Sequence, residues 1–427
     1  MNTATFGALW VSALGQDRTH PGDLIRFSGS AGTFGLQADD LRRGIFLPGA
    51  TRSGKTTVLC QALAALRPRL GPGDALVIFD PRGDYVGRFY RPGDLVVDPR
   101  PARGTGAWNL FRDLDPGDDY ALQQSSSRIA GRLFSHQQNQ LTPFFTTAPR
   151  RLLESVLYVL GRQQVATGRC YNNRDLVAFS ANLTPDALDW VIRNSPAPGE
   201  LASYLGDATA ASDQALGVLG EYQAAVAKLR PFARHTGMGV GMADFVRTGG
   251  GRACFLQYDA SAPDTQDEIW GLMVDLALSA ALETRTGNGR LYLVLDELPL
   301  LGRQVDLLER ALNFGAGQHV GGILCAAQSL AQLEDRYGPA KTQALTAGFG
   351  TVVGLRPNDA ATRTFLQQRC GTVFRPVQYA RCGILTATVQ QTPLLPDDQM
   401  LAMGVGDAIV AAPPAPPFAF HFSLDPH

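Results

Sequence analysis

The sequence predicts an α/β fold in which a mostly parallel sheet carries an inserted all-α domain, and three observations support this prediction. Residues 49–57 read GATRSGKTT directly after the apolar run 44–47, which matches the phosphate-loop pattern G-x-x-x-x-G-K-[ST] between a strand and a helix. Unbroken apolar runs recur along the chain, and these are typical of parallel strands covered on both faces. Between residues 114 and 241, helical periodicity replaces these runs.

This change of pattern defines the predicted domains. We expect a discontinuous nucleotide-binding domain over residues 1–113 and 242–427, with a Pro-rich tail from about residue 413, and an all-α insertion over residues 114–241. A chain of 427 residues exceeds the usual size of a single core, so two structural units are expected.

The phosphate loop has a physical reason for its spacing. Gly49 and Gly54 allow backbone angles that a Cβ would forbid, so successive N–H groups can turn toward phosphates at the start of the following helix. Lys55 is expected to reach the outer phosphates, and the Thr56 hydroxyl to take one Mg2+ coordination position. The ATP-binding loop is predicted to comprise Gly49, Ala50, Thr51, Arg52, Ser53, Gly54, Lys55, Thr56 and Thr57. A glycine-rich turn without a ligand is disfavoured because every fixed position matches.

Composition narrows the function classes without selecting one. Hydrophobic residues make up 45% and charged residues 18% of the chain, as in ordinary globular proteins. The formal net charge of −1 gives no bulk attraction to nucleic acid, so any such contact requires a local patch or an assembled channel. Six single cysteines favour a reduced, cytoplasmic setting, and the N-terminal apolar stretch 5–14 is too short to span a bilayer. We expect a soluble protein that reaches the inner membrane, if at all, through partners.

Further elements follow from periodicity. Strands are expected at Leu24 to Phe27, Ala75 to Phe79, Asp94 to Val97, Arg252 to Tyr258, Leu291 to Leu295, Gly322 to Ala327, Thr351 to Leu355 and Ala408 to Ala411. Helices are expected at Thr56 to Leu66, Arg150 to Leu160, Asn172 to Ala178, Pro185 to Arg193, Ala215 to Leu229, Thr265 to Thr284, Ser329 to Tyr337, Gly338 to Leu345 and Asp359 to Cys370. The tail from Pro413 is expected to be extended or disordered.

A second motif stands at the end of the apolar run LYLVL. Asp296 and Glu297 follow this strand in the manner of a Walker B element, so Asp296 is expected to hold Mg2+ and Glu297 to deprotonate the attacking water. The alternative, that these acids only cap the next helix, is weak beside Lys55. Gln328 ends the strand GILCAA and is either a sensor of the γ-phosphate or a solvated side chain.

These segments together resemble the TraG/TraD family of type IV secretion coupling proteins, which are related to the FtsK and HerA translocases. The matching stretches are GATRSGKT, FDPRGDYVGRFYRPGDLVVDPRPARGTGAWNLF, DELPLLGR, AAQSLAQLEDRYG and VVGLRPND. The resemblance implies a RecA-like P-loop NTPase domain with an all-α domain, assembled as a homo-hexamer around single- or double-stranded DNA, with ATP and Mg2+ between subunits. It gives Lys55 and Thr56 the phosphate and Mg2+ roles, Asp296 and Glu297 the Walker B roles, and Gln328 the sensing role. A relaxase and secretion-channel proteins are the implied partners.

The chain departs from the family pattern in three places. Family members usually begin with a membrane-spanning region, and no such region is predicted in this sequence. We therefore expect either a separate anchor subunit or a soluble variant. Gln318 stands where the family commonly has an arginine, so a finger acting on a neighbouring subunit would have to be Arg303, Arg310 or Arg356, or hydrolysis would be slow. Arg52 occupies a loop position that is more often glycine.

Three functions stay open at this point. The leading one is ATP-driven DNA translocation by a soluble, anchor-less coupling protein. The others are a low-turnover, nucleotide-gated adaptor that recruits secretion substrates, and an FtsK- or HerA-like translocase outside conjugation.

Overall fold

The structure is a computed structural model that describes residues 17–30, 32–100, 104–134, 144–205, 212–234, 237–261, 266–283, 289–302, 306–381 and 384–424. The chain divides into two compact units. The first comprises Met1–Leu70, Tyr292–Pro299 and Glu309–His427, and the second comprises Gly71–Leu291 and Leu300–Leu308. The predicted α/β class is confirmed: the main sheet has nine strands in the order β13-β12-β9-β3-β8-β7-β4-β6-β5.

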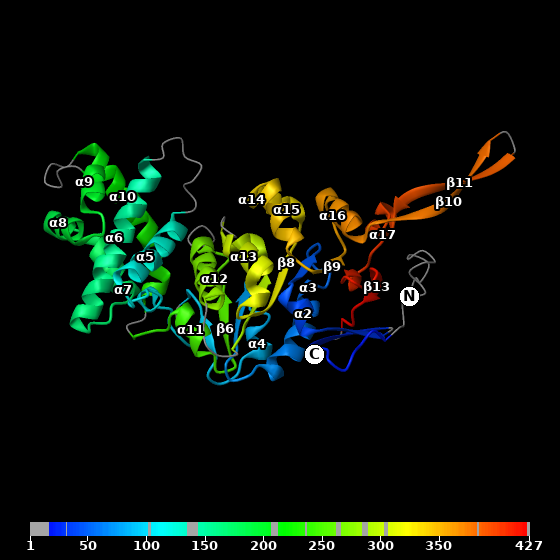
Figure 1. Cartoon of the computed structure of the whole chain (residues 1–427), viewed down its shortest axis with the longest axis horizontal. Coiled ribbons are helices and arrows are strands. Elements are labelled where there is room, and N and C mark those ends of the chain that lie inside the picture. The colour runs from blue at the N-terminus through cyan, green and yellow to red at the C-terminus, as the bar shows by residue number, and fades with distance from the viewer. Residues whose placement is uncertain are drawn as a thin grey trace. The chain divides into compact units, whose positions relative to one another are not determined.

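The first unit contains the phosphate-loop part of the sheet (Figure 1). Its main-sheet strands are β3 (Ile45–Pro48), β7 (Leu291–Asp296), β8 (Val320–Ala327), β9 (Thr351–Leu355), β12 (Asp407–Ala411) and β13 (Phe418–His421). Its α-helices are α2 (Ala38–Arg42), α3 (Lys55–Leu66), α13 (Asp306–Phe314, which starts in the second unit), α14 (Leu330–Tyr337), α15 (Pro339–Ala347), α16 (Ala360–Cys370) and α17 (Asp397–Leu401). β3 pairs in parallel with both β8 and β9, and each of these strands is buried along its whole length. Unbroken apolar runs therefore form the covered strands, as predicted.

Two antiparallel hairpins accompany this sheet. β1 (Ile25–Gly29) pairs with β2 (Gly32–Leu36), and β10 (Thr372–Arg381) pairs with β11 (Ile384–Pro393). Figure 1 shows β10 and β11 as a long ribbon extending beyond α16 and α17. This second hairpin was not among the strands predicted from the sequence.

The C-terminal tail takes the extended one of its two predicted forms and is ordered as a strand. β13 pairs with β12 in antiparallel orientation, and Phe420 and Phe422 pack edge-on against Phe34. The alternating phenylalanines supply enough buried apolar surface to order the segment despite the preceding prolines.

The second unit holds β4 (Ala75–Asp80), β5 (Leu95–Val97) and β6 (Arg252–Gln257), which pair in parallel with β6 in the middle. Its helices are α4 (Val86–Phe89), α5 (Asp119–Leu133), α6 (Phe144–Thr167), α7 (Asn173–Ala181), α8 (Pro185–Asn194), α9 (Pro198–Leu205), α10 (Asp213–Ala227), α11 (Met242–Thr248) and α12 (Asp267–Leu282). The helical stretch thus shares a compact unit with three strands, and the domain boundaries at 114 and 241 stay a prediction.

Local sequence explains where these helices begin. Asp118, Thr184 and Ser212 each accept a backbone N–H bond at the start of α5, α8 and α10, and Asn172 forms a capping box with Asp175 at α7. The predicted apolar face of α6 is buried, which fixes how this helix packs; it comprises Leu152, Leu153, Val156, Leu157 and Leu160.

Candidate nucleotide-binding site

The phosphate loop runs from the end of β3 into α3, as predicted. Gly54 caps α3 with φ 112°, and Arg52 has φ 60°, a left-handed conformation that non-glycine residues adopt rarely. A Cβ on Gly49 would lie 2.7 Å from the Cβ of Leu355, which is closer than such atoms approach. The expected backbone angle is confirmed at Gly54 but was wrong for Gly49, whose φ is not positive. Glycine at position 49 is required instead by the close approach of β9.

Lys55 lies inside the loop that precedes it. Its side chain is buried, and Nζ donates hydrogen bonds to the carbonyl oxygens of Gly49 (2.6 Å) and Ala50 (3.0 Å). Thr56 and Thr57 follow in the first turn of α3 and are half-buried. Ser53 is fully buried, and its Oγ has no hydrogen-bond partner within the described part of the chain. The loop thus holds an ammonium and hydroxyl groups at the start of a helix.

Strand pairing brings the downstream motif to this loop. The N–H of Gly49 donates to the carbonyl of Ala327 (3.1 Å), the last residue of β8. Gln328, the next residue, therefore lies beside the phosphate loop. The Thr51 hydroxyl donates to Oε1 of Gln328 (2.9 Å). The N–H of Gln328 in turn donates to Oε1 of Glu297 (3.4 Å), which follows β7. The loop, Gln328 and the acidic pair are therefore together at one edge of the sheet.

The electrostatics agree with this convergence. Burial raises the pKa of Glu297, and the nearby Asp296 raises it further, whereas the hydrogen bonds with Gln328 and the charge of Lys55 lower it. Asp296 and Glu297 are both buried. Glu297 also has φ 104°, a strained backbone conformation of the kind that clusters at functional sites.

The three arginines predicted as possible fingers differ in position and exposure. Arg303 lies outside the described residues, and Arg310 is exposed on α13. Arg356 is half-buried at the end of β9, and its carbonyl accepts the N–H of Ala50 (2.8 Å), so its backbone touches the phosphate loop of its own chain. Gln318 is exposed before β8. Action on a neighbouring subunit stays a prediction for these arginines.

One part of the site was missed by the sequence analysis. The N–H of Gly406 donates to the carbonyl of Ser53 (3.0 Å), and the Gly406 Cα lies 3.5 Å from where a Cβ on Gly54 would stand. Residues before β12 therefore support the phosphate loop from the far end of the sequence. Gly406 has φ 87°, and its glycine is the feature of the sequence that could have indicated this contact. A single glycine before a strand is too common to predict a contact with the phosphate loop.

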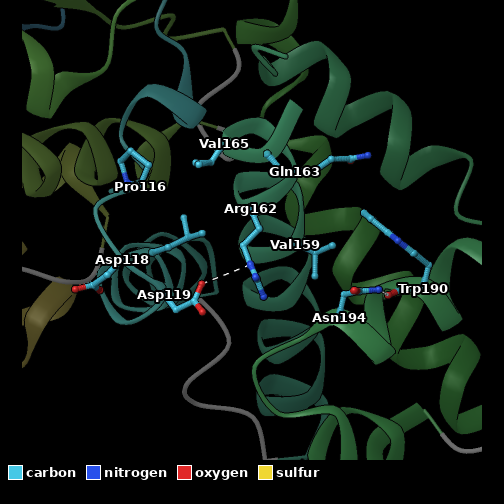
Figure 2. A pocket seen from close by; sticks show the side chains of 11 residues that line it. Pro116, Asp118, Asp119, Val159, Arg162, Gln163, Val165, Trp190 and Asn194 are labelled. Carbon is cyan, nitrogen blue, oxygen red and sulfur yellow. Dashed lines mark hydrogen bonds and ion pairs between the residues drawn. The ribbon is translucent and has the colours of Figure 1, made fainter. Parts of the chain in front are cut away.

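A separate pocket of about 380 Å³ lies in the helical stretch, between α5, α6 and α8 (Figure 2). Asp119 and Arg162 face each other across it at 3.5 Å, and Trp190 and Asn194 line another side. The side chains of this ion pair are more than half exposed, so the pair contributes little to stability. None of the predicted site residues lies here.

The sheet and its loop are those of a RecA-like P-loop NTPase fold, and comparison with known proteins defines the family. A family model described as the type IV secretion-system coupling protein DNA-binding domain matches residues 30–374. The chain belongs to this family, which confirms the resemblance seen in the motifs.

Individual relatives agree with this assignment. The coupling protein TraD of Escherichia coli (strain K12) is 28% identical over 303 residues, which cover 68% of this chain and 38% of TraD, so the chain spans well under half of that protein. The unbound conjugative coupling protein TrwBdeltaN70 has a TM-score of 0.75 at 20% identity, covering 96% of this chain and 90% of that one. TrwB in complex with ADP and Mg2+ gives 0.74 at 20% identity, covering 97% and 92%. VirB4 of Thermoanaerobacter pseudethanolicus gives 0.57 at 13% identity, covering 96% and 99%. These structural likenesses show the shared fold.

Within the described residues, no helix is both long enough and apolar enough to cross a membrane.

Proposed function

We propose that this chain binds ATP with Mg2+ and hydrolyses it to drive the passage of DNA, or of a DNA–protein substrate, in type IV secretion. The observation that carries the proposal is the convergence of Lys55, Gln328 and Glu297 at one edge of the sheet. TrwB has been described with ADP and Mg2+ and with a non-hydrolysable ATP analogue, which supports ATP as the ligand here.

The residues present fit the proposed ligands. Lys55 would exchange its bonds with the loop carbonyls for the outer phosphates, because an ammonium binds a phosphate more strongly than a neutral carbonyl. Thr56 and Asp296 offer the hard oxygen ligands that Mg2+ prefers, with water and phosphate completing the shell. Bound Mg2+ would supply charge neutralisation at the β- and γ-phosphates.

Glu297 is the proposed base for the attacking water. Its raised pKa brings it closer to the working pH, which favours proton transfer, while its bonds to Gln328 keep the carboxylate oriented. Gln328, held by Thr51, would contact the water or the γ-phosphate.

The proposed assembly is a homo-hexamer around DNA, with a relaxase and secretion-channel proteins as further partners. The description of the family model as a DNA-binding domain supports DNA as the substrate. In this assembly, an arginine of a neighbouring subunit would contact the bound nucleotide, and the candidates are Arg303, Arg310 and Arg356.

A second function is favoured by one observation. Gln318 is exposed at the position where the family commonly has an arginine, so a low-turnover adaptor that binds ATP and recruits substrates is the alternative. An FtsK- or HerA-like translocase outside conjugation has the same site chemistry.

ATP hydrolysis with and without single- and double-stranded DNA tests these proposals. A motor should show DNA-stimulated turnover that is abolished by Lys55→Ala, through lost binding, and by Glu297→Gln, with ATP still bound. Tight ATP binding without turnover under any DNA condition would support the adaptor function instead. Unchanged hydrolysis in both variants would refute the proposed catalytic site.

A further inference from the structure

An open pocket of about 700 Å³ lies in the second unit, at the carboxyl ends of its three strands. β4 and β6 end together at Asp80 and Gln257, and β5 ends one register position away at Val97. The lining includes Arg82, Tyr90, Asp98, Arg100, Thr105 and Gln257. Because ligands of parallel α/β sheets bind outside the carboxyl ends of the strands, this pocket has the position of a binding site, and its lining residues are not those of the phosphate loop.

Arginine side chains dominate the exposed charged groups around this pocket, which the sequence alone does not indicate. In residues 80–100 the acidic side chains balance the basic ones: Asp80, Asp84, Asp94 and Asp98 against Arg82, Arg88, Arg91 and Arg100. The structure buries most of the acids and exposes most of the arginines. Three carboxylates are less than 10% exposed, whereas Arg82, Arg88 and Arg91 are exposed. Arginine side chains therefore make up most of the charged groups of this segment that are exposed to solvent.

The buried carboxylates are occupied by internal bonds. Asp80 accepts the backbone N–H groups of residues 84, 85 and 86 and the amide of Gln257 (3.0 Å). Asp94 accepts the N–H groups of Arg91 (2.7 Å) and Ala253 (2.7 Å). Since these bonds shape the turn after β4 and anchor β5 to β6, Asp80 and Asp94 are part of the scaffold and do not line the pocket.

One arginine of the pocket is held in a fixed orientation. Asp98 accepts both Nε and Nη2 of Arg100 at 2.8 Å, and also the backbone N–H of Arg100. The fork is bidentate, so the guanidinium loses little further freedom when it binds an anion through its remaining N–H groups. Arg82, which is exposed, adds a second guanidinium to the lining, and Tyr90, 42% exposed, adds an aromatic surface.

We propose that this pocket binds one nucleotide unit of single-stranded DNA, with the phosphate at Arg82 and Arg100 and the base stacked on Tyr90. Arginine with an exposed aromatic ring is the combination by which proteins hold single strands without reading sequence. The proposal rests on the proposed DNA-transfer function, and it adds a contact surface that the motifs did not reveal.

Two substitutions test the phosphate contact and the base contact independently. Arg82→Ala should weaken binding of labelled oligo-dT and lower the slope of log K against log salt by about 0.7, the contribution of one phosphate of a single strand. Tyr90→Leu should weaken binding at least about fivefold without changing this slope, because stacking contributes about 1–3 kcal/mol per base. Both residues lie outside the phosphate loop, so ATP hydrolysis without DNA should stay at the wild-type rate.

Matched controls come from the same unit. Arg193→Ala and Tyr120→Leu change exposed residues of α8 and α5, and should leave oligo-dT binding within twofold of wild type. Fluorescence anisotropy with the full chain measures all four variants, with AMP as competitor.

Loss of binding in both pocket variants, with the two salt slopes as stated, supports the proposal. Binding within twofold of the controls in either variant overturns it, and so does displacement of oligo-dT by AMP at equal nucleotide concentration, which would indicate a mononucleotide site. Absence of DNA binding by the wild-type chain would overturn the proposed function as well.

Discussion

Replacing Arg132 by methionine should destabilise the second unit strongly. Arg132 lies on α5 and is 3% exposed; its Nε forms an ion pair with Asp275 of α12 (3.3 Å), and its Nη2 donates to the carbonyl of Leu301 (2.9 Å). Gly271 leaves room for this contact, because a Cβ there would lie 2.1 Å from both Arg132 Nη2 and the Leu301 oxygen. Methionine fills similar volume but leaves Asp275 and this carbonyl without their partner.

The magnitude follows from burial. Removing one partner of a buried ion pair costs about 3–5 kcal/mol, because the remaining charge stays in a poorly solvated site. Burial already raises the pKa of Asp275 to about 6, and the charge of Arg132 acts to lower it. A carboxyl whose pKa is higher in the folded state than in the unfolded state loses stability as pH rises from about 4 through 6. Without Arg132 this loss should be larger and extend to higher pH, so the variant should be most impaired at pH 8 and less impaired at pH 5.

Urea unfolding followed by tryptophan fluorescence measures this effect, since Trp108, Trp190 and Trp270 all belong to the second unit. Arg162→Met is the matched control: it breaks an exposed pair and should cost less than about 1 kcal/mol. The reasoning is refuted if Arg132→Met costs less than about 1 kcal/mol at pH 8, or if its cost is equal at pH 5 and pH 8.

Three further predictions concern the site and the pH dependence of stability. Gly49→Ala should reduce ATP affinity at least tenfold by calorimetry, because its Cβ would meet Leu355 at 2.7 Å and force the loop to move. Thr51→Val should lower kcat about two- to tenfold with little change in KM, since one hydrogen bond to Gln328, worth about 1 kcal/mol, is lost. Burial raises the pKa of Asp113 to about 6, so wild-type stability should fall between pH 4 and pH 7, and Asp113→Asn should reduce this fall in urea unfolding.

Each of these has an outcome that contradicts it. Gly87→Ala, where an added Cβ has open space, is the control for Gly49→Ala, and equal ATP affinity in the two variants would exclude a steric role at position 49. A rise in KM with unchanged kcat would assign Thr51 to binding only. An unaltered pH profile in Asp113→Asn would mean that other carboxyls dominate.

Much of the nucleotide site could be predicted because its signals are local. The phosphate-loop spacing and the apolar runs before Asp80 and Asp296 each reflect one strand and the turn that follows it, and the structure has both strands where they were expected. The bond between Gln328 and Glu297 was not readable, because it depends on which strands become neighbours.

Other features depend on packing that no local pattern encodes. The Pro-rich tail was predicted to be extended or disordered, and its sequence did not distinguish the two; the packing of Phe418 and Phe420 against Phe34 favours the extended form. The exposed arginines around Arg82 could not be predicted for a similar reason: the sequence does not tell which charged side chains of residues 80–100 are buried.

The bond from Gly406 to Ser53 has a consequence for how the protein matures. During translation the phosphate loop leaves the ribosome early, yet the residues before β12 that support it are made much later. The nascent chain must therefore wait with an unfinished nucleotide site, and a fusion or cleavage that displaces residues 404–424 should abolish ATP binding although every Walker residue is intact.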